Sequence, residues 1–317
     1  MDTLGLGSWI ESAQSVLRSN WDNQDLRDFA ARETPHMILG PLGWLLRADI
    51  NATWARWFID GFADSAKYEI NGDLSYAHLY EEIKDALAGE VNDTPDDEVR
   101  ELARKIAKAA WQEISFRRAI RRDGLSVAEK EELWFSNEPT PRCYLCGYAF
   151  SDLAKKKFLG RAASGLKISP SLVVDFVRPR GQVSADLLPE IDHVRPVAAG
   201  GAASVENMRL ACGWCNRYKS SHGQLYDVPS RYTARLRHPV LGEVSVPQPL
   251  WIIRVVGLRG RCEHRGGCDA QVKNAELFVA PRRSSGALAP SNCAAYCSEH
   301  DPWRDVRFVG TRLLGAI

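Results

Sequence analysis

The sequence predicts an α+β protein with three parts: a helical N-terminal domain, a central domain that carries paired cysteines, and a small β-rich C-terminal domain with a second cysteine cluster. Three observations favour this class. Apolar residues recur mainly at helical spacing in the first part, two Cys-x-x-Cys pairs lie in the second, and short apolar runs broken by glycine and proline fill the third. A chain of 317 residues is long enough for two or three domains.

Residues 1–138 are predicted to form an acidic helical domain with a net charge of −10. Thr94-Pro95-Asp96-Asp97 is typical of a helix start, because it combines a capping hydroxyl, a first-turn proline and acids near the positive end of the helix dipole. Ser126 and Glu129 form a capping-box pattern that begins another helix. Further helices are expected over residues 9–18, 37–47, 52–66 and 76–88. We expect this domain to bind a protein partner, to regulate the rest of the chain, or to dimerise.

Residues 137–141 read as a linker into a central domain over residues 139–222, which has a net charge of +6. Two close cysteine pairs suit a tetrahedral, structural zinc site: Cys143, Cys146, Cys212 and Cys215. The gap between the pairs is longer than in a usual zinc knuckle, and we assign the excess to an insertion over residues 147–187. Buried free thiols or a redox pair are the alternatives.

Residues 223–317 carry a net charge of +5 and predict short strands over 243–246, 250–256, 276–279 and 306–309. A second zinc site is predicted with the ligands Cys262, Cys268, Cys297 and His300. Cys293 and His264 compete for one ligand position. The Cys-x-x-His spacing favours the chosen pair and leaves Cys293 as a free thiol. Arginines near this cluster are candidate phosphate contacts.

The segment 188–220 carries an Asp-His pair, a glycine-rich loop, an asparagine and the second cysteine pair, followed by Asn216 and Lys219. This ordered set resembles the HNH, or ββα-metal, endonucleases, in which one histidine and a divalent ion hydrolyse a phosphodiester. The resemblance implies that the central domain contains a zinc-stabilised ββα nuclease unit. The Cys₃His cluster is similar to the short zinc fingers that accompany phage and bacterial nuclease domains.

The resemblance assigns roles to individual residues. His193 would be the general base, Asp192 and Asn216 the protein ligands of the catalytic metal, and Asn207 would hold His193 in orientation through a hydrogen bond. Lys219, Arg195 and Arg217 are candidate substrate-binding residues. The last motif position holds Asn216 where the family name has histidine. An all-oxygen donor set of this kind favours Mg²⁺ or Mn²⁺ as the catalytic ion.

The predicted function is a metal-dependent endonuclease that hydrolyses DNA phosphodiester bonds and nicks duplex DNA, because one metal site cuts one strand. A setting in restriction or antiphage defence is implied by the resemblance alone. The alternative is a catalytically silent, zinc-stabilised nucleic-acid-binding protein or a partner-dependent effector subunit. No apolar run approaches the roughly 18 residues of a membrane helix, and we expect a cytoplasmic protein with no membrane partner that could form a homodimer.

Overall fold

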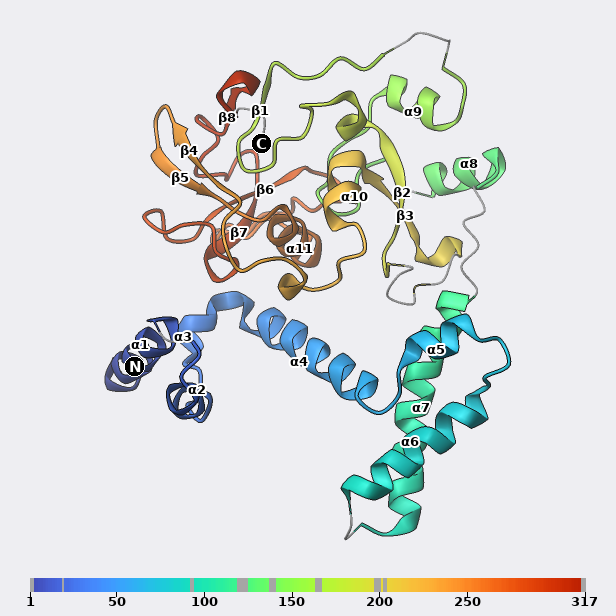
Figure 1. Ribbon diagram of the computed structural model, residues 1–317. Helices are drawn as coiled ribbons and strands as arrows, with labels where there is room; N and C mark the ends of the chain where they lie inside the picture. Colours follow the sequence, from blue (N-terminus) through green and yellow to red (C-terminus); the bar gives the residue numbers. More distant parts are fainter. Residues whose placement is uncertain are drawn as a thin grey trace.

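The computed structural model describes residues 3–18, 20–91, 94–118, 125–136, 141–162, 167–196, 201 and 204–314. Figure 1 shows a mixed body of small sheets and helices, with the first seven α-helices along one side of it. These helices are α1 (Thr3–Arg18), α2 (Asn23–Ala30), α3 (His36–Leu39), α4 (Gly43–Asp60), α5 (Ser65–Ile70), α6 (Tyr76–Glu90) and α7 (Asp96–Arg118). The helical N-terminal region predicted from the sequence is confirmed.

Two helix starts lie where the sequence signals predicted them. Helix α7 begins at Asp96, with acids in its first turn. Helix α8 (Val127–Phe135) begins after Ser126, whose hydroxyl accepts the backbone N–H of Glu129 at 3.3 Å, while the Glu129 carboxylate accepts the Ser126 N–H at 2.8 Å. The predicted linker over residues 137–141 lies, apart from its last residue, outside the described residues.

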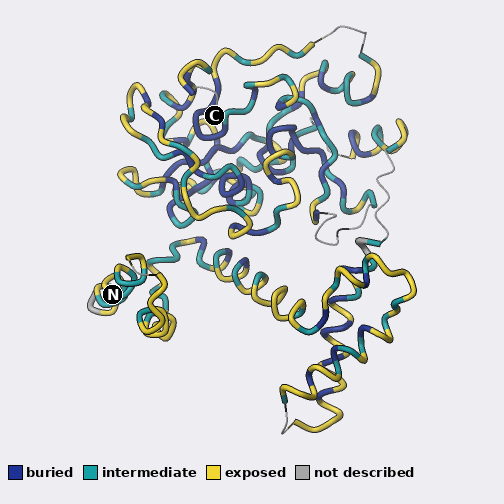
Figure 2. The backbone as a smooth tube through the Cα atoms, viewed as in Figure 1, coloured by how far each residue is buried: buried dark blue, intermediate teal, exposed yellow. Residues whose placement is uncertain are grey.

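The described part of the chain has two separate hydrophobic cores. The smaller core joins α5, α6 and α7, with Tyr68, Leu79, Ile83 and Ile114 inside it. The larger core runs from the region of α8 to the C-terminal part and also takes in Leu42 and Leu45. Figure 2 shows the buried chain concentrated in this larger body. The helical region therefore divides its packing between its own bundle and the body.

Helix α4 is joined to the body by a buried ion pair. The Asp49 carboxylate is almost fully enclosed; it accepts Nε of Arg254 at 2.8 Å and the backbone N–H of Leu225 at 2.8 Å. The Tyr226 hydroxyl donates to the carbonyl of Leu46 at 3.3 Å. Separation of α4 from the body would leave the charge of Asp49 or Arg254 without its partner, which is costly for a buried charge. We therefore treat α4 as part of the body.

The strands form four two-stranded antiparallel sheets: β1 (Val173–Asp175) with β8 (Phe308–Gly310), β2 (Pro189–His193) with β3 (Met208–Cys212), β4 (Ala234–His238) with β5 (Gly242–Val246), and β6 (Leu277–Pro281) with β7 (Cys293–Cys297). The predicted insertion supplies α9 (Asp152–Phe158) and β1. Since β1 pairs with β8, the insertion joins the central part to the C-terminal part.

One predicted strand is wrong. Residues 250–256 belong to helix α11 (Pro249–Arg259), which begins with a proline in its first turn and ends at Gly260 in the left-handed conformation. Six of its first eight residues are buried, and Arg254 is the single polar residue among the eight, so the run has too small a polar face to reveal a helical period. The C-terminal part is thus built of hairpins around a buried helix. Among the described residues, no helix is both long and apolar enough to cross a membrane.

Candidate functional site

The Asp-His motif lies in a ββα unit made of β2, β3 and α10 (Gly213–Lys219). Strand β2 ends at His193, β3 returns antiparallel to it, and α10 starts directly after Cys212. Successive side chains of a strand alternate between its two faces, so Glu190 and Asp192 share one face of β2. The unit is compact because β3 ends at the residue that caps the helix.

Asp192 is a buried carboxylate with two partners from distant parts of the chain. It accepts the hydroxyl of Tyr144 at 2.5 Å and the ammonium of Lys219 at 3.0 Å. Lys219 also donates to the carbonyl of His193 at 2.6 Å and is itself buried. In the structure, the Lys219 side chain therefore holds the Asp192–His193 segment. Its expected contact with a phosphate stays a prediction.

Asn216 faces the same strand from α10. Its amide Nδ2 donates to Oε2 of Glu190 at 2.7 Å. Asp192, Asn216 and Glu190 thus line the contact between β2 and α10 with oxygen donors, the atom type that hard divalent ions prefer. No hydrogen bond to Oδ1 of Asn216 is present within the described residues. These oxygen atoms are of the type that Mg²⁺ and Mn²⁺ prefer, and Glu190 is an additional acid that the motif alone did not reveal.

His193 lies at the end of β2 and is half-buried. Its Nε2 atom is enclosed and has no hydrogen-bond partner among the described residues. Burial lowers the pKa of His193, an effect that the charge of Asp192 opposes and that of Lys219 reinforces. The ring is therefore biased toward the neutral imidazole, which is the form that a general base requires.

Asn207 closes the loop that follows His193, as expected, but through the backbone. Its Oδ1 accepts the N–H of Arg195 at 2.9 Å, and its Nδ2 donates to the carbonyl of Arg195 at 3.0 Å. The backbone carbonyl of Asn207 accepts the N–H of Val194 at 2.8 Å. Asn207 thus fixes the two residues after His193, whereas the expected hydrogen bond to the ring is not formed in the described structure.

The two candidate arginines occupy different settings. Arg195 is exposed on the loop after β2. Arg217 is half-exposed on α10, and its guanidinium pairs with the buried Asp186 of the insertion at 2.5 Å. Arg217 therefore ties the insertion to the helix, and Arg195 is the better placed of the two to reach a polyanion.

The first cysteine cluster lies directly beside the ββα unit. Its four sulfur atoms lie within 4.8 Å of one another and all four residues are buried: Cys143, Cys146, Cys212 and Cys215. The sulfurs of Cys146 and Cys212 are 4.0 Å apart, close to the roughly 3.8 Å edge of a tetrahedral zinc–thiolate site. The cluster could hold zinc. It would then clamp the end of β3 and the first turn of α10.

The turn between Cys143 and Cys146 is tightly enclosed. Gly147 has φ +77°, and a Cβ added there would lie 1.9 Å from the carbonyl oxygen of Ala275. The backbone N–H of Tyr144 donates to the carbonyl of Leu210 in β3 at 2.9 Å. Consequently the knuckle extends the β2–β3 pair on the other edge of β3 and delivers the Tyr144 hydroxyl to Asp192.

Two arginines of the insertion cover the first cluster. Arg180 donates to the sulfur of Cys146 at 3.6 Å and to Glu276 at 2.7 Å, and Arg178 donates to the same glutamate at 2.6 Å. Four thiolates around one Zn²⁺ carry a net charge of −2, so these buried cations would offset that charge. The insertion therefore completes the cluster's surroundings.

The second cluster brings together the predicted set: Cys262, Cys268, Cys297 and His300. Nδ1 of His300 lies 3.3 Å from the sulfur of Cys297, and the sulfurs of Cys268 and Cys297 are 3.9 Å apart. The cluster could hold a second zinc ion. It is more open than the first, because Cys268 and His300 are partly exposed.

The two competing residues lie outside this group. Cys293 is buried in the larger core, where burial raises the pKa of its thiol to about 12. His264 is exposed and stacks on the ring of His300, with 3.9 Å between the ring centroids. Both positions agree with the ligand set chosen from the spacing.

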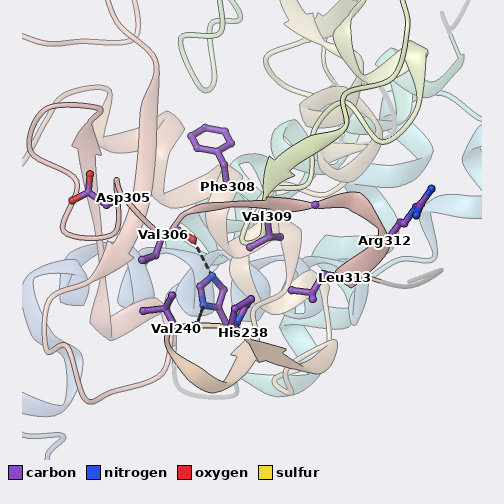
Figure 3. A pocket seen from close by; sticks show the side chains of 10 residues that line it. His238, Val240, Asp305, Val306, Phe308, Val309, Arg312 and Leu313 are labelled. Carbon is purple, nitrogen blue, oxygen red and sulfur yellow. Dashed lines mark hydrogen bonds between the residues drawn. The ribbon is translucent and has the colours of Figure 1, made fainter.

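A cavity of about 440 Å³ between β4 and β8 contains another histidine (Figure 3). Nδ1 of His238 accepts the N–H groups of Val240 and Leu241 at 3.1 and 3.0 Å, so its Nε2 donates to the carbonyl of Val306 at 2.9 Å. Both ring nitrogens are occupied by the backbone. This histidine therefore has a structural role.

These features define a ββα unit with an Asp-His pair and a cysteine knuckle. Residues 183–222 match the model of the HNH endonuclease family. The match spans η2 (Ser184–Leu187), β2, β3 and α10, so it supports a nuclease of the HNH type that acts on nucleic acid. Neither the curated proteins nor the solved structures contain a match to the chain.

Proposed function

We propose that this protein is a divalent-metal-dependent endonuclease that nicks duplex DNA at the β2–α10 site. The observation that carries the proposal is the position of His193, which directly follows the buried Asp192 in a segment that matches the HNH family, and whose enclosed Nε2 has no hydrogen-bond partner among the described residues. A single site of this kind acts on one phosphodiester at a time, which favours a nick over a double-strand break.

The chain's own residues would divide the work as follows. The neutral imidazole of His193 takes a proton from the attacking water. Tyr144 and Lys219 hold the Asp192 carboxylate, and Asn207 holds the backbone that follows the histidine. Asp192 and Asn216, with Glu190 beside them, would hold the divalent ion. When bound, Mg²⁺ or Mn²⁺ neutralises charge on the phosphate and stabilises the leaving oxygen.

Cleavage of supercoiled plasmid by the full-length protein with Mg²⁺ or Mn²⁺ tests the proposal. We expect open-circular product from the wild type, and a rate lower by about 10²- to 10⁴-fold for His193→Ala, which is the range of general-base catalysis. His222→Ala is a matched control, because this nearby histidine also has an enclosed ring nitrogen without a hydrogen bond in the part of the chain that the structure describes. Undiminished cleavage by His193→Ala with unchanged zinc content would disprove the assignment.

The alternative function is a silent nucleic-acid-binding protein. Its distinguishing observation would be binding of DNA by wild type and His193→Ala alike, with no open-circular product from either protein under any divalent ion. The wholly retained motif, from Asp192 and His193 to Asn207 and Asn216, favours the active enzyme.

A further inference from the structure

A basic pocket lies at the C-terminal end of α11, beside the second cysteine cluster. It has a volume of about 450 Å³, and its charged lining residues are Arg259, Arg261, Glu263, Arg265 and Arg282, together with the exposed His264. Four guanidinium groups thus face one carboxylate. A zinc ion held by three thiolates and a neutral imidazole would carry a net charge of −1. The four arginines outweigh this charge together with that of Glu263, so the pocket stays positive.

Two of the arginines are held in place by their neighbours. Arg282 donates through Nε to the carbonyl of Cys293 at 3.1 Å and pairs with Glu263 at 2.5 Å. Arg259 donates to the carbonyl of Pro41 at 2.9 Å, and its Nε lies 3.3 Å from the same glutamate. That Nε atom is buried and has no hydrogen bond among the described residues. The single carboxylate is therefore shared between two cations.

The other two arginines have no such partner. Arg261 and Arg265 are exposed, and neither forms an ion pair or a hydrogen bond through its side chain within the described structure. Guanidinium groups match the geometry of phosphate oxygens and bind them through paired hydrogen bonds. The pocket therefore combines two arginines that are held in place with two whose guanidinium groups are available. This arrangement suits the binding of an anion.

The pocket lies close in the fold to the candidate active site. Helix α11 packs against α10, and its residues Gly257 and Leu258 line a smaller cavity together with Tyr144 and Lys219. Arg259, the next residue, lines the basic pocket. The basic pocket therefore lies at the end of a helix that contacts the candidate active site.

We propose that this pocket binds a backbone phosphate of nucleic acid, away from the phosphodiester that is cut. The proposal rests on the proposed function for the identity of the polymer as DNA. A free phosphate ion or a mononucleotide has the same chemistry, so the test separates these sources.

The test compares Arg261→Ala/Arg265→Ala with Arg235→Ala/Arg237→Ala in the full-length protein. The control pair is exposed on β4, outside the pocket, and removes the same charge. Binding of a labelled short duplex is measured by fluorescence anisotropy across a salt series, without added divalent ion. Removal of the contact with one backbone phosphate should lower the slope of log K against log salt by roughly 1. The control variant should keep the wild-type slope.

Equal loss of slope in both double variants would overturn the proposal, because the effect would then be one of net charge. Unchanged duplex binding by the pocket variant, with loss of inorganic phosphate or deoxynucleotide binding in calorimetry, would assign the pocket to a small anion and also overturn it. The plasmid assay separates the two proposals. If the wild type nicks DNA and the pocket variant binds the duplex with full affinity, the nuclease proposal stands and only the proposal of a phosphate-binding pocket is refuted. Zinc content and thermal midpoint confirm that the variants are folded.

Discussion

The two cysteine clusters use similar ligands in opposite surroundings. Around the Cys₄ cluster the arginines point inward: the side chains of Arg178 and Arg180 are 3% and 12% exposed, and both pair with Glu276. Around the Cys₃His cluster, Arg261 and Arg265 are exposed and unpaired within the described structure. The first cluster is closed and organises the elements beside it, whereas the second presents charge to solvent. The spacing of the cysteines does not distinguish a closed structural cluster from one that presents charge to solvent. The burial and pairing of the surrounding arginines distinguish them.

The hairpin of β6 and β7 connects the two clusters. The backbone N–H of Leu277 donates to the carbonyl of Cys146 in the first cluster at 2.9 Å. In the register of the hairpin, the same residue pairs with Cys297 of the second cluster. One hairpin therefore touches both knuckles and gives damage at one cluster a direct route to the other.

The largest expected effect is the loss of the first cluster. Cys212→Ser removes a buried ligand that both ends β3 and caps α10. Binding of a structural zinc is worth about 10–16 kcal/mol in small domains, which is comparable with the whole stability of a typical protein, about 5–15 kcal/mol. We expect loss of one zinc ion, loss of the cooperative thermal transition of the body, and no plasmid nicking. Zinc analysis and circular dichroism measure these changes.

The matched variant at the second cluster should be milder. Cys268→Ser removes a partly exposed candidate ligand that belongs to no element of the ββα unit. We expect loss of one zinc ion and weaker duplex binding, with nicking retained at high enzyme concentration. If Cys268→Ser unfolds the body as completely as Cys212→Ser, the two clusters do not differ in their contribution to the fold, and the contrast drawn above is wrong.

The next effect is smaller and concerns the bond from the first knuckle to the active site. Tyr144→Phe keeps the ring but removes the hydroxyl that donates to Asp192. Loss of a hydrogen bond that orients a metal ligand typically costs about 10- to 100-fold in metal affinity. We expect the Mn²⁺ concentration for half-maximal nicking to rise by that factor, and direct Mn²⁺ binding, measured by electron paramagnetic resonance, to weaken equally.

Tyr148→Phe is the control for that variant. Tyr148 lies in the same knuckle, and its ring stacks under the Arg180 guanidinium at 3.9 Å, but its hydroxyl has no hydrogen bond to the Asp-His segment in the described structure. It should leave Mn²⁺ binding unchanged. A Tyr144→Phe protein with wild-type Mn²⁺ affinity and a reduced rate would instead place the hydroxyl in a role other than holding the metal ligand.

Much of this site could be predicted from the sequence because its residues lie in short patterns. The Cys-x-x-Cys pairs and the Asp-His motif each need only neighbouring positions. Tyr144 and Glu190 were missed for the opposite reason: their partners lie 48 and 26 positions away and meet them only through the fold. The sequence made Asn216 a candidate metal ligand and Lys219 a candidate substrate contact, but it did not show that Asp192 pairs with the lysine.

The fold shows the same limit. The capping box at Ser126 is local, and the helix that it predicts is present. The pairing of β1 with β8 and the ion pair of Asp49 with Arg254 join segments more than 130 residues apart, for which the sequence carries no local signal. Helix α11 was misread because burial on all sides removes the polar face from which a period is recognised.

The smallest expected effect tests the ligand set of the second cluster. Cys293 lies in β7, four residues before Cys297, yet it belongs to the core and not to the cluster. Cys293→Ala should therefore leave the zinc content unchanged and lower stability by only about 1 kcal/mol, the usual cost of a small substitution. Zinc analysis beside a thermal melt measures both quantities.

The chemistry of the thiol gives an independent readout in the unmodified protein. With burial raising its pKa to about 12, Cys293 stays protonated at pH 8, where an exposed cysteine with a pKa near 8.5 is partly thiolate. Native protein should therefore leave Cys293 unlabelled by iodoacetamide at pH 8, and denatured protein should label it fully. Loss of one zinc ion in Cys293→Ala would make Cys293 a ligand in place of Cys297 or His300, and rapid native labelling would show that the thiol is accessible and not enclosed in the core.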